Sequence, residues 1–163
     1  MFSNQQLSIL KTVIAAETDP TFVSLRNAGS TGLMAEWLNG PSTFTVWRTA
    51  VPQDEIMQNG FDWVQVDNLS VGKARIWEWL FSNDNRTMNP SKPNVRAGID
   101  ECWKGTSAML AVRAAIYVHC KRVATRAEKV FAIGVGTDAS PATLSWEGQV
   151  SDYDVVRAVN EVF

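Results

Sequence analysis

The sequence feature that most constrains the fold is residues 108–118, AMLAVRAAIYV, which are apolar at every position except Arg113. This stretch is too rich in alanine for a β-strand and too short to cross a bilayer as a helix. It predicts a helix over about residues 106–123, buried on most sides at the centre of a core. Arg113 within it needs a carboxylate or carbonyl partner, or must face an interface.

Patterns on both sides of this stretch predict smaller helices packed against it. Apolar residues recur at helical spacing behind capping residues in four other segments, which are residues 3–17, 68–81, 94–103 and 151–163. Residues 44–48, FTVWR, alternate like a strand but are few, so we expect an extended segment without strand partners. The fold class is therefore mostly α, a compact helical bundle around one buried central helix.

The end of the chain differs in composition from the rest. Residues 134–147 are rich in Gly, Thr, Ser and Pro, which predicts an exposed and loosely held segment. It leads to an amphipathic helix at residues 151–163. We therefore predict a helical core domain over residues 1–137 and a flexible arm over residues 138–163 that contacts a partner.

Charge is distributed unevenly along the chain. Residues 92–129 carry eight basic and three acidic residues, a net of +5, whereas the whole chain carries −2, so the remainder carries −7. This distribution suits head-to-tail packing or docking on a charged partner, and it also fits a helical face that is merely solvated. The seven Trp residues serve cores and interfaces equally well.

The sequence contains possible motifs for catalysis and cofactor binding, but the residues around each motif do not fit such a site. Residues 133–139 match GxGxxA, yet a helical pattern precedes the glycines and Ser140-Pro141 follows, so a turn is expected instead of a dinucleotide site. His119 and Cys120 are adjacent and point about 100° apart on a helix, which prevents them from acting as a nucleophile pair. We expect no cofactor, no metal site, no catalytic residue and no enzymatic activity.

Targeting and membrane signals are also weak. The first twenty residues have no basic region before their apolar positions, which argues against a signal peptide. No apolar run approaches 18 residues, so we expect no contact with a membrane. Two cysteines outside any CxxC pair are expected to be buried free thiols.

Long stretches of the chain resemble a family of tailed-bacteriophage neck proteins of the head-tail connector, or head-completion adaptor, type. The most specific stretch is residues 121–137, KRVATRAEKVFAIGVGT, followed by SPATLSWEG at residues 140–148. The resemblance also covers VRAGID at residues 95–100, FTVWRTAV at residues 44–51 and VDNLSVGKARIWEWLF at residues 66–81. It therefore extends over nearly the whole chain.

The resemblance implies a structural virion protein at the head-tail junction, assembled in the host cytoplasm. Its subunits would form a ring, expected to be a dodecamer, beneath the portal protein and would join the capsid to the next neck or tail protein. Contact with DNA would be at most incidental, in the channel. The alternatives are a capsid cement or decoration protein, or another neck ring such as a stopper or tail terminator. Stoppers and terminators tend to be β-rich, so the helical pattern favours the adaptor.

The basic cluster and two aromatic residues are the expected contacts with other subunits or partners. The basic cluster fits ion pairs within a subunit or between subunits better than it fits contact with DNA. Binding to DNA would need more positive charge and an exposed aromatic platform. The expected interface residues are Arg113, Lys121, Arg122, Arg126, Lys129, Trp146 and Tyr153.

Overall fold

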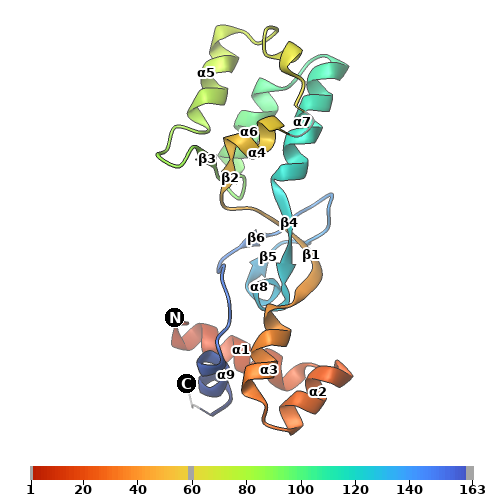
Figure 1. The fold of residues 1–163 in the computed structure, drawn as a ribbon, viewed down its shortest axis with the longest axis vertical. Coiled ribbons are helices and arrows are strands. Elements are labelled where there is room, and N and C mark those ends of the chain that lie inside the picture. The colour runs from red at the N-terminus through yellow and green to blue at the C-terminus, as the bar shows by residue number, and fades with distance from the viewer. Residues whose placement is uncertain (1, 59–60, 161–163) are drawn as a thin grey trace. The chain divides into compact units, whose positions relative to one another are not determined.

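The computed structural model describes residues 2–58 and 61–160 and is mostly helical, as the sequence predicts (Figure 1). The helices are α1 (Asn4–Ala16), α2 (Pro20–Asn27), α3 (Thr31–Asn39), α4 (Gln53–Gln58), η1 (Trp63–Gln65), α5 (Val71–Trp79), α6 (Pro93–Cys102), α7 (Ser107–His119), α8 (Arg126–Val130) and α9 (Asp152–Asn160). The strands are β1 (Pro41–Trp47), β2 (Val51–Pro52), β3 (Thr87–Met88), β4 (Lys121–Thr125), β5 (Ala132–Ile133) and β6 (Thr143–Leu144). No helix among the described residues has the length and apolar content that spanning a membrane requires.

The chain divides into two compact units. Unit 1 consists of Met1–Thr45 and Val123–Phe163, and unit 2 consists of Val46–Arg122. Each unit has its own cluster of buried apolar side chains. This division differs from the predicted boundary after residue 137, because it groups the end of the chain with the beginning.

Unit 1 is built on α1, α3 and α9. Ser3 and Gln6 form a capping box that starts α1, which then presents Leu7, Leu10 and Ile14 to the core at helical spacing. Helix α9 packs against both α1 and α3, as Figure 1 shows in blue beside the two red and orange helices. Segments from the two ends of the sequence therefore share one core.

Helix α9 does not form the flexible arm that the sequence predicted. Its Val155 and Ala158 are fully buried in the core of unit 1. The residue that leads into the helix is also held, since the Asn39 side chain donates to the Val150 carbonyl at 2.8 Å and accepts from the Val150 amide at 2.8 Å. The helix is described as far as Asn160, and residues 161–163 of the predicted helix lie outside the described residues.

Residues 132–145 are also more ordered than their composition indicated. Strands β5 and β6 form an antiparallel hairpin with Ala132 opposite Leu144. Gly136 has a φ of +73° and lies against the Phe44 ring, in a place where a Cβ atom would collide with that ring. The prediction of a loosely held segment is therefore wrong here, because glycine allows the close approach that fixes the turn.

Unit 2 contains the apolar stretch that the sequence placed at the centre of the fold. Helix α7 forms as predicted over residues 107–119, but only one face is buried, by Met109, Val112 and Ile116. Leu110 and Val118 are exposed. The prediction of burial on most sides is not confirmed, since the many alanines favour a helix without requiring a buried position.

The strands account for two further differences from the sequence analysis. Helix α7 ends at His119, before the predicted residue 123, because Lys121–Thr125 forms β4. Strand β4 pairs with β1, which contains the FTVW segment that was expected to lack a strand partner. The two strands lie about 80 residues apart in the sequence. The alternation of residues within either segment therefore does not predict that they pair.

The core of unit 2 is rich in aromatic rings. Trp77 and Trp103 meet edge to face with their ring centroids 5.4 Å apart, and Phe61 contacts both. Trp77 and Trp103 are buried, whereas the Trp63 and Trp79 side chains are exposed, at 56% and 64% of their surface. Tryptophan in this unit thus serves both the core and the surface.

Candidate interaction site

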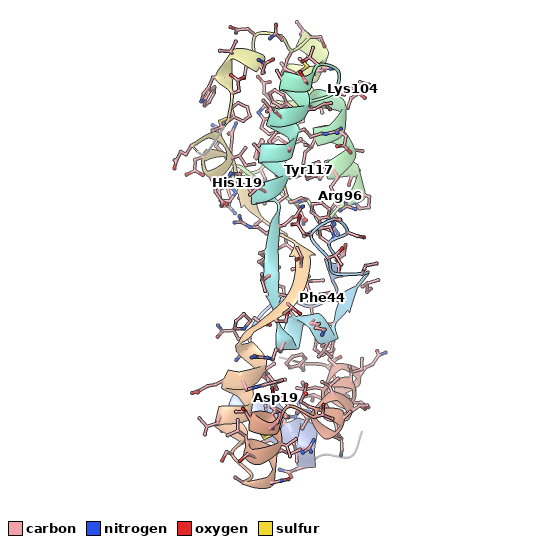
Figure 2. The ribbon with its side chains drawn as sticks, turned by 90° about the vertical axis from the view of Figure 1, so that its right-hand side faces the viewer. Asp19, Phe44, Arg96, Lys104, Tyr117 and His119 are labelled. Atoms are coloured by element: carbon pink, nitrogen blue, oxygen red, sulfur yellow. The ribbon has the colours of Figure 1, made fainter. Side chains whose placement is uncertain are left out.

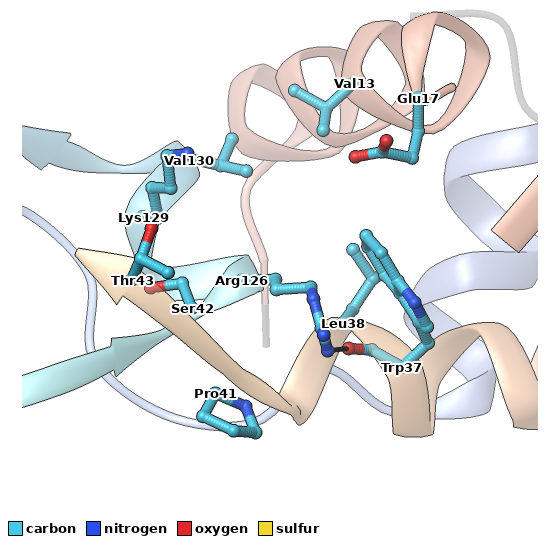
Figure 3. A pocket seen from close by; sticks show the side chains of 10 residues that line it. All are labelled: Val13, Glu17, Trp37, Leu38, Pro41, Ser42, Thr43, Arg126, Lys129 and Val130. Atoms are coloured by element: carbon cyan, nitrogen blue, oxygen red, sulfur yellow. Dashed lines mark hydrogen bonds between the residues drawn. The ribbon is translucent and has the colours of Figure 1, made fainter. Parts of the chain in front are cut away.

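Unit 1 contains a cavity of about 500 Å³ between α1, the end of α3, the start of β1 and α8 (Figure 3). Its lining combines an apolar wall with charged and hydroxyl-bearing side chains. The lining residues are Val13, Glu17, Trp37, Leu38, Pro41, Ser42, Thr43, Arg126, Lys129 and Val130. The volume lies within the range of roughly 300–1,000 Å³ that is usual for ligand pockets.

Arg126 is positioned by the local fold of α8. Thr125 and Glu128 form a capping box at the start of this helix. The Arg126 guanidinium donates to the Trp37 carbonyl at 2.9 Å, the bond drawn as a dashed line in Figure 3. It also lies 4.2 Å from the centroid of the Trp37 ring. Arg126 therefore joins α8 to the last turn of α3, where the Trp37 carbonyl also accepts from the Gly40 amide at 3.1 Å.

Lys129 lies one turn after Arg126, so both side chains reach the same pocket. Its ammonium nitrogen is 5.9 Å from the centroid of the Phe44 ring. Among the residues that the structure describes, no carboxylate forms an ion pair with Arg126 or Lys129. The pocket thus offers two cations to an anionic group.

Glu17 supplies the single acidic side chain of the lining. Its carboxylate accepts hydrogen bonds from the amides of Thr18 and Asp19, at 2.8 and 2.9 Å, and Figure 3 shows it pointing toward the pocket. Arg26 donates to the Ile14 carbonyl at 2.7 Å and so fixes the end of α1. With Arg126 and Lys129, the lining has a formal charge of +1. It is suited to an apolar group that carries a carboxylate.

The other expected interface residues are distributed over both units. Arg113 is 3.5 Å from the Asp100 carboxylate, so its charge is matched within unit 2. Trp146 stacks on Phe2 with the ring centroids 4.5 Å apart, inside unit 1. Tyr153 is exposed on α9. Lys121 and Arg122 lie on β4 in unit 2, so only Arg126 and Lys129 of the predicted set line this pocket.

Sequence reasoning did not identify the rest of the pocket. Val13, Glu17, Trp37 and Thr43 come from three segments that local patterns treat separately. The one sequence signal that bears on the pocket is the capping box at Thr125, because it places Arg126 and Lys129 on a single helical turn. The partners of that turn depend on tertiary packing.

Unit 2 contains a second group of charged side chains around the end of α7. Arg48 donates to the Glu55 carboxylate at 2.9 Å and to the His119 carbonyl at 3.0 Å. His119 Nδ1 lies 3.3 Å from the same carboxylate, and Figure 2 labels this histidine beside the end of α7. The Arg48 hydrogen bond lowers the pKa of Glu55, an effect that burial partly opposes. This group ties α4 and the residue that follows β1 to the end of α7, which is a structural role.

Both cysteines are buried and lack the lowered pKa of a reactive thiol. Burial raises the pKa of the Cys102 thiol to about 11 and that of Cys120 to about 12. Within residues 2–58 and 61–160, no three His, Cys, Asp or Glu side chains are grouped to hold a metal ion. Comparison with protein-family models, with curated proteins and with solved structures gives no match.

Proposed function

We propose that this chain is a non-enzymatic structural virion protein, a head-tail connector (adaptor) subunit that forms a ring under the portal and joins the capsid to the tail. The resemblance of residues 95–100, 111–137 and 140–158 to phage neck proteins supports this proposal. The mostly helical fold agrees with an adaptor better than with a β-rich stopper or terminator.

The observation that carries the proposal is the opposite net charge of the two units. Unit 1 holds five basic and nine acidic residues, a net charge of −4, whereas unit 2 holds ten basic and eight acidic residues, a net charge of +2. A subunit with two oppositely charged units favours contact between unit 1 of one copy and unit 2 of the next. Repeated head-to-tail contacts of this kind close into a ring when the rotation between copies permits it.

The exposed aromatic side chains of unit 2 also support a role in assembly. Trp63 and Trp79 are both more than half exposed, and Val64 and Val71 are exposed in the same unit. Large exposed apolar groups are typical of interfaces, where tryptophan contributes much of the binding energy. The expected partners are therefore further copies of the chain, the portal protein and the next neck or tail protein.

A genetic experiment tests this role. We expect a phage that lacks the chain to accumulate filled or partly filled heads and free tails that do not join, as seen by electron microscopy of lysates. Supplying the chain from a plasmid should restore joined particles. Normal joined particles without the chain would contradict the proposal, and unstable heads that still join tails would favour a cement or decoration protein.

A further inference from the structure

We propose that residues 62–64 of unit 2, Asp-Trp-Val, insert into the cavity of unit 1 in a second copy of this chain. This inference rests on the proposed function, because it supplies the contact between neighbouring subunits of the ring. The two surfaces of that contact are the exposed turn at η1, called the 62–64 turn below, and the pocket lined by Arg126 and Lys129.

The 62–64 turn projects apolar side chains from a fixed backbone. Trp63 is 56% exposed and Val64 is 68% exposed. The turn is closed by the Asp62 carboxylate, which accepts from the Val64 amide at 3.1 Å, and by the Gln65 amide, which donates to the Asp62 carbonyl at 3.1 Å. The Phe61 ring anchors Trp63 at a centroid distance of 5.1 Å. Because the turn is already formed, little backbone entropy is lost when it binds.

The pocket matches this turn in size and in polarity. Its volume of about 500 Å³ is large enough for a Trp side chain together with a small aliphatic neighbour. Val13, Leu38 and Val130 supply the apolar wall. An indole that enters this space removes its own surface and that of the wall from water, which is the main favourable contribution.

Charge is complementary both between the turn and the pocket and between the two whole units. In the contact itself, the acidic Asp62 side chain approaches a pocket whose lining carries +1, with Arg126 and Lys129 lacking a carboxylate partner among the described residues. Over whole units the signs are reversed, since the turn belongs to a unit of +2 and the pocket to a unit of −4. Both the approach and the final contact are therefore attractive.

The contact joins different surfaces on the two copies and is therefore heterologous. The 62–64 turn and the pocket belong to different units of the described chain, so each copy can bind one neighbour through its turn and another through its pocket. Such contacts generate closed rings or open filaments, according to the rotation between copies. A second copy is the occupant that provides both the apolar turn and the opposite unit charge.

Sedimentation velocity of the purified full chain over a range of concentrations tests the contact. We expect association in the wild type that Trp63→Ala weakens at least about ten-fold, the loss usual for a buried interface tryptophan. Trp79→Ala is the matched control for this contact, because Trp79 is also more than half exposed in the same unit but lies outside the 62–64 turn. Lys129→Glu should weaken association, whereas Lys11→Glu, which makes the same charge change in the same unit outside the pocket, should have a smaller effect.

A covalent trap distinguishes this contact from other modes of association. Chains carrying Val64→Cys are mixed with chains carrying Val130→Cys under mild oxidation, and we expect disulfide-linked heterodimers. Val71→Cys mixed with Val130→Cys should give few, although Val71 is also exposed. The inference is overturned if the wild type stays monomeric at all concentrations, if Trp79→Ala and Trp63→Ala act alike, or if the two cysteine pairs cross-link equally.

Failure of this contact is separable from failure of the proposed function. If the phage that lacks the chain still fails to join heads to tails, and Trp63→Ala restores joining as well as the wild type does, the neck role stands and the 62–64 turn is not the subunit contact. If the chain is dispensable for joining, the proposed function fails whatever the purified protein does in solution.

Discussion

The Arg126 guanidinium lies 4.2 Å from the centroid of the Trp37 ring and donates a hydrogen bond to the Trp37 carbonyl at 2.9 Å. One side chain thus covers the indole and satisfies a carbonyl at the end of α3. Arg126 is therefore both a structural tie between α8 and α3 and a wall of the pocket in unit 1.

Substitution of Arg126 should destabilise unit 1. We expect Arg126→Ala to lower the free energy of unfolding by about 1–3 kcal/mol, because it removes a charged hydrogen bond and a cation–π contact. Urea unfolding followed by tryptophan fluorescence measures this change. Lys129→Ala is the control, since the exposed Lys129 side chain makes no hydrogen bond to a described residue, and it should change stability by less than about 0.5 kcal/mol. Equal effects of the two variants would contradict the structural role of Arg126.

Removal of residues 138–163 should unfold unit 1. This deletion removes α9, whose Val155 and Ala158 are fully buried, and leaves the faces of α1 and α3 that pack on it exposed to water. We expect the truncated chain to lose helical circular dichroism beyond the contribution of α9 and to expose hydrophobic surface to a fluorescent dye.

Tyr153→Ala provides a matched control for that truncation. Tyr153 lies on the same helix with 61% of its surface exposed, so its loss should leave the fold unchanged. A truncated chain that keeps the stability of the intact protein would contradict the packing of α9 and support a separate arm.

The Glu55 carboxylate should make unit 2 sensitive to acid. The Arg48 hydrogen bond lowers the pKa of Glu55 below its unfolded value, so the stabilisation is present above about pH 4.3 and is lost as pH falls through the lower folded pKa. We expect Glu55→Gln to lower the free energy of unfolding near pH 7 by about 1 kcal/mol, a value reduced for the partial exposure of the pair.

The comparison of stability curves between pH 3 and pH 7 tests this prediction. The difference between wild type and Glu55→Gln should shrink as the wild-type carboxylate becomes protonated. Asp54→Asn is the control, because the neighbouring Asp54 is exposed and forms no ion pair with a described residue. A constant difference across this pH range would exclude ionised Glu55 as the source.

The two thiols should resist modification in the folded protein. Burial raises the pKa of Cys102 to about 11 and that of Cys120 to about 12, so little thiolate exists near pH 8. We expect slow reaction with a chromogenic disulfide reagent in buffer and rapid reaction of both thiols in denaturant. Rapid labelling of either cysteine in the native protein would show that its side chain is accessible.

Sequence patterns anticipated those features that depend on nearby residues. The cap at the start of α1 and the helical face of Leu7, Leu10 and Ile14 follow from spacing along the chain. The burial of α9 did not follow, because its contacts come from α1 and α3 at the other end of the sequence. The pairing of β1 with β4 is equally non-local.

The pocket also shows that residues brought together by tertiary packing are not predicted from the sequence. Arg126 and Lys129 were singled out by their charge, but Trp37 and Glu17 entered the site only through tertiary packing. Conversely, Arg113 belonged to the same basic cluster in sequence and is instead paired with Asp100 in unit 2. Charge density along a chain therefore indicates interface candidates without separating them from internal ion pairs.

Copy number in the virion tests the proposed neck role most directly. Quantitative mass spectrometry of purified virions, scaled to the major capsid protein, gives this number for the chain. A neck ring beneath the portal predicts about a dozen copies per particle. Hundreds of copies, or none, would contradict the proposed neck role.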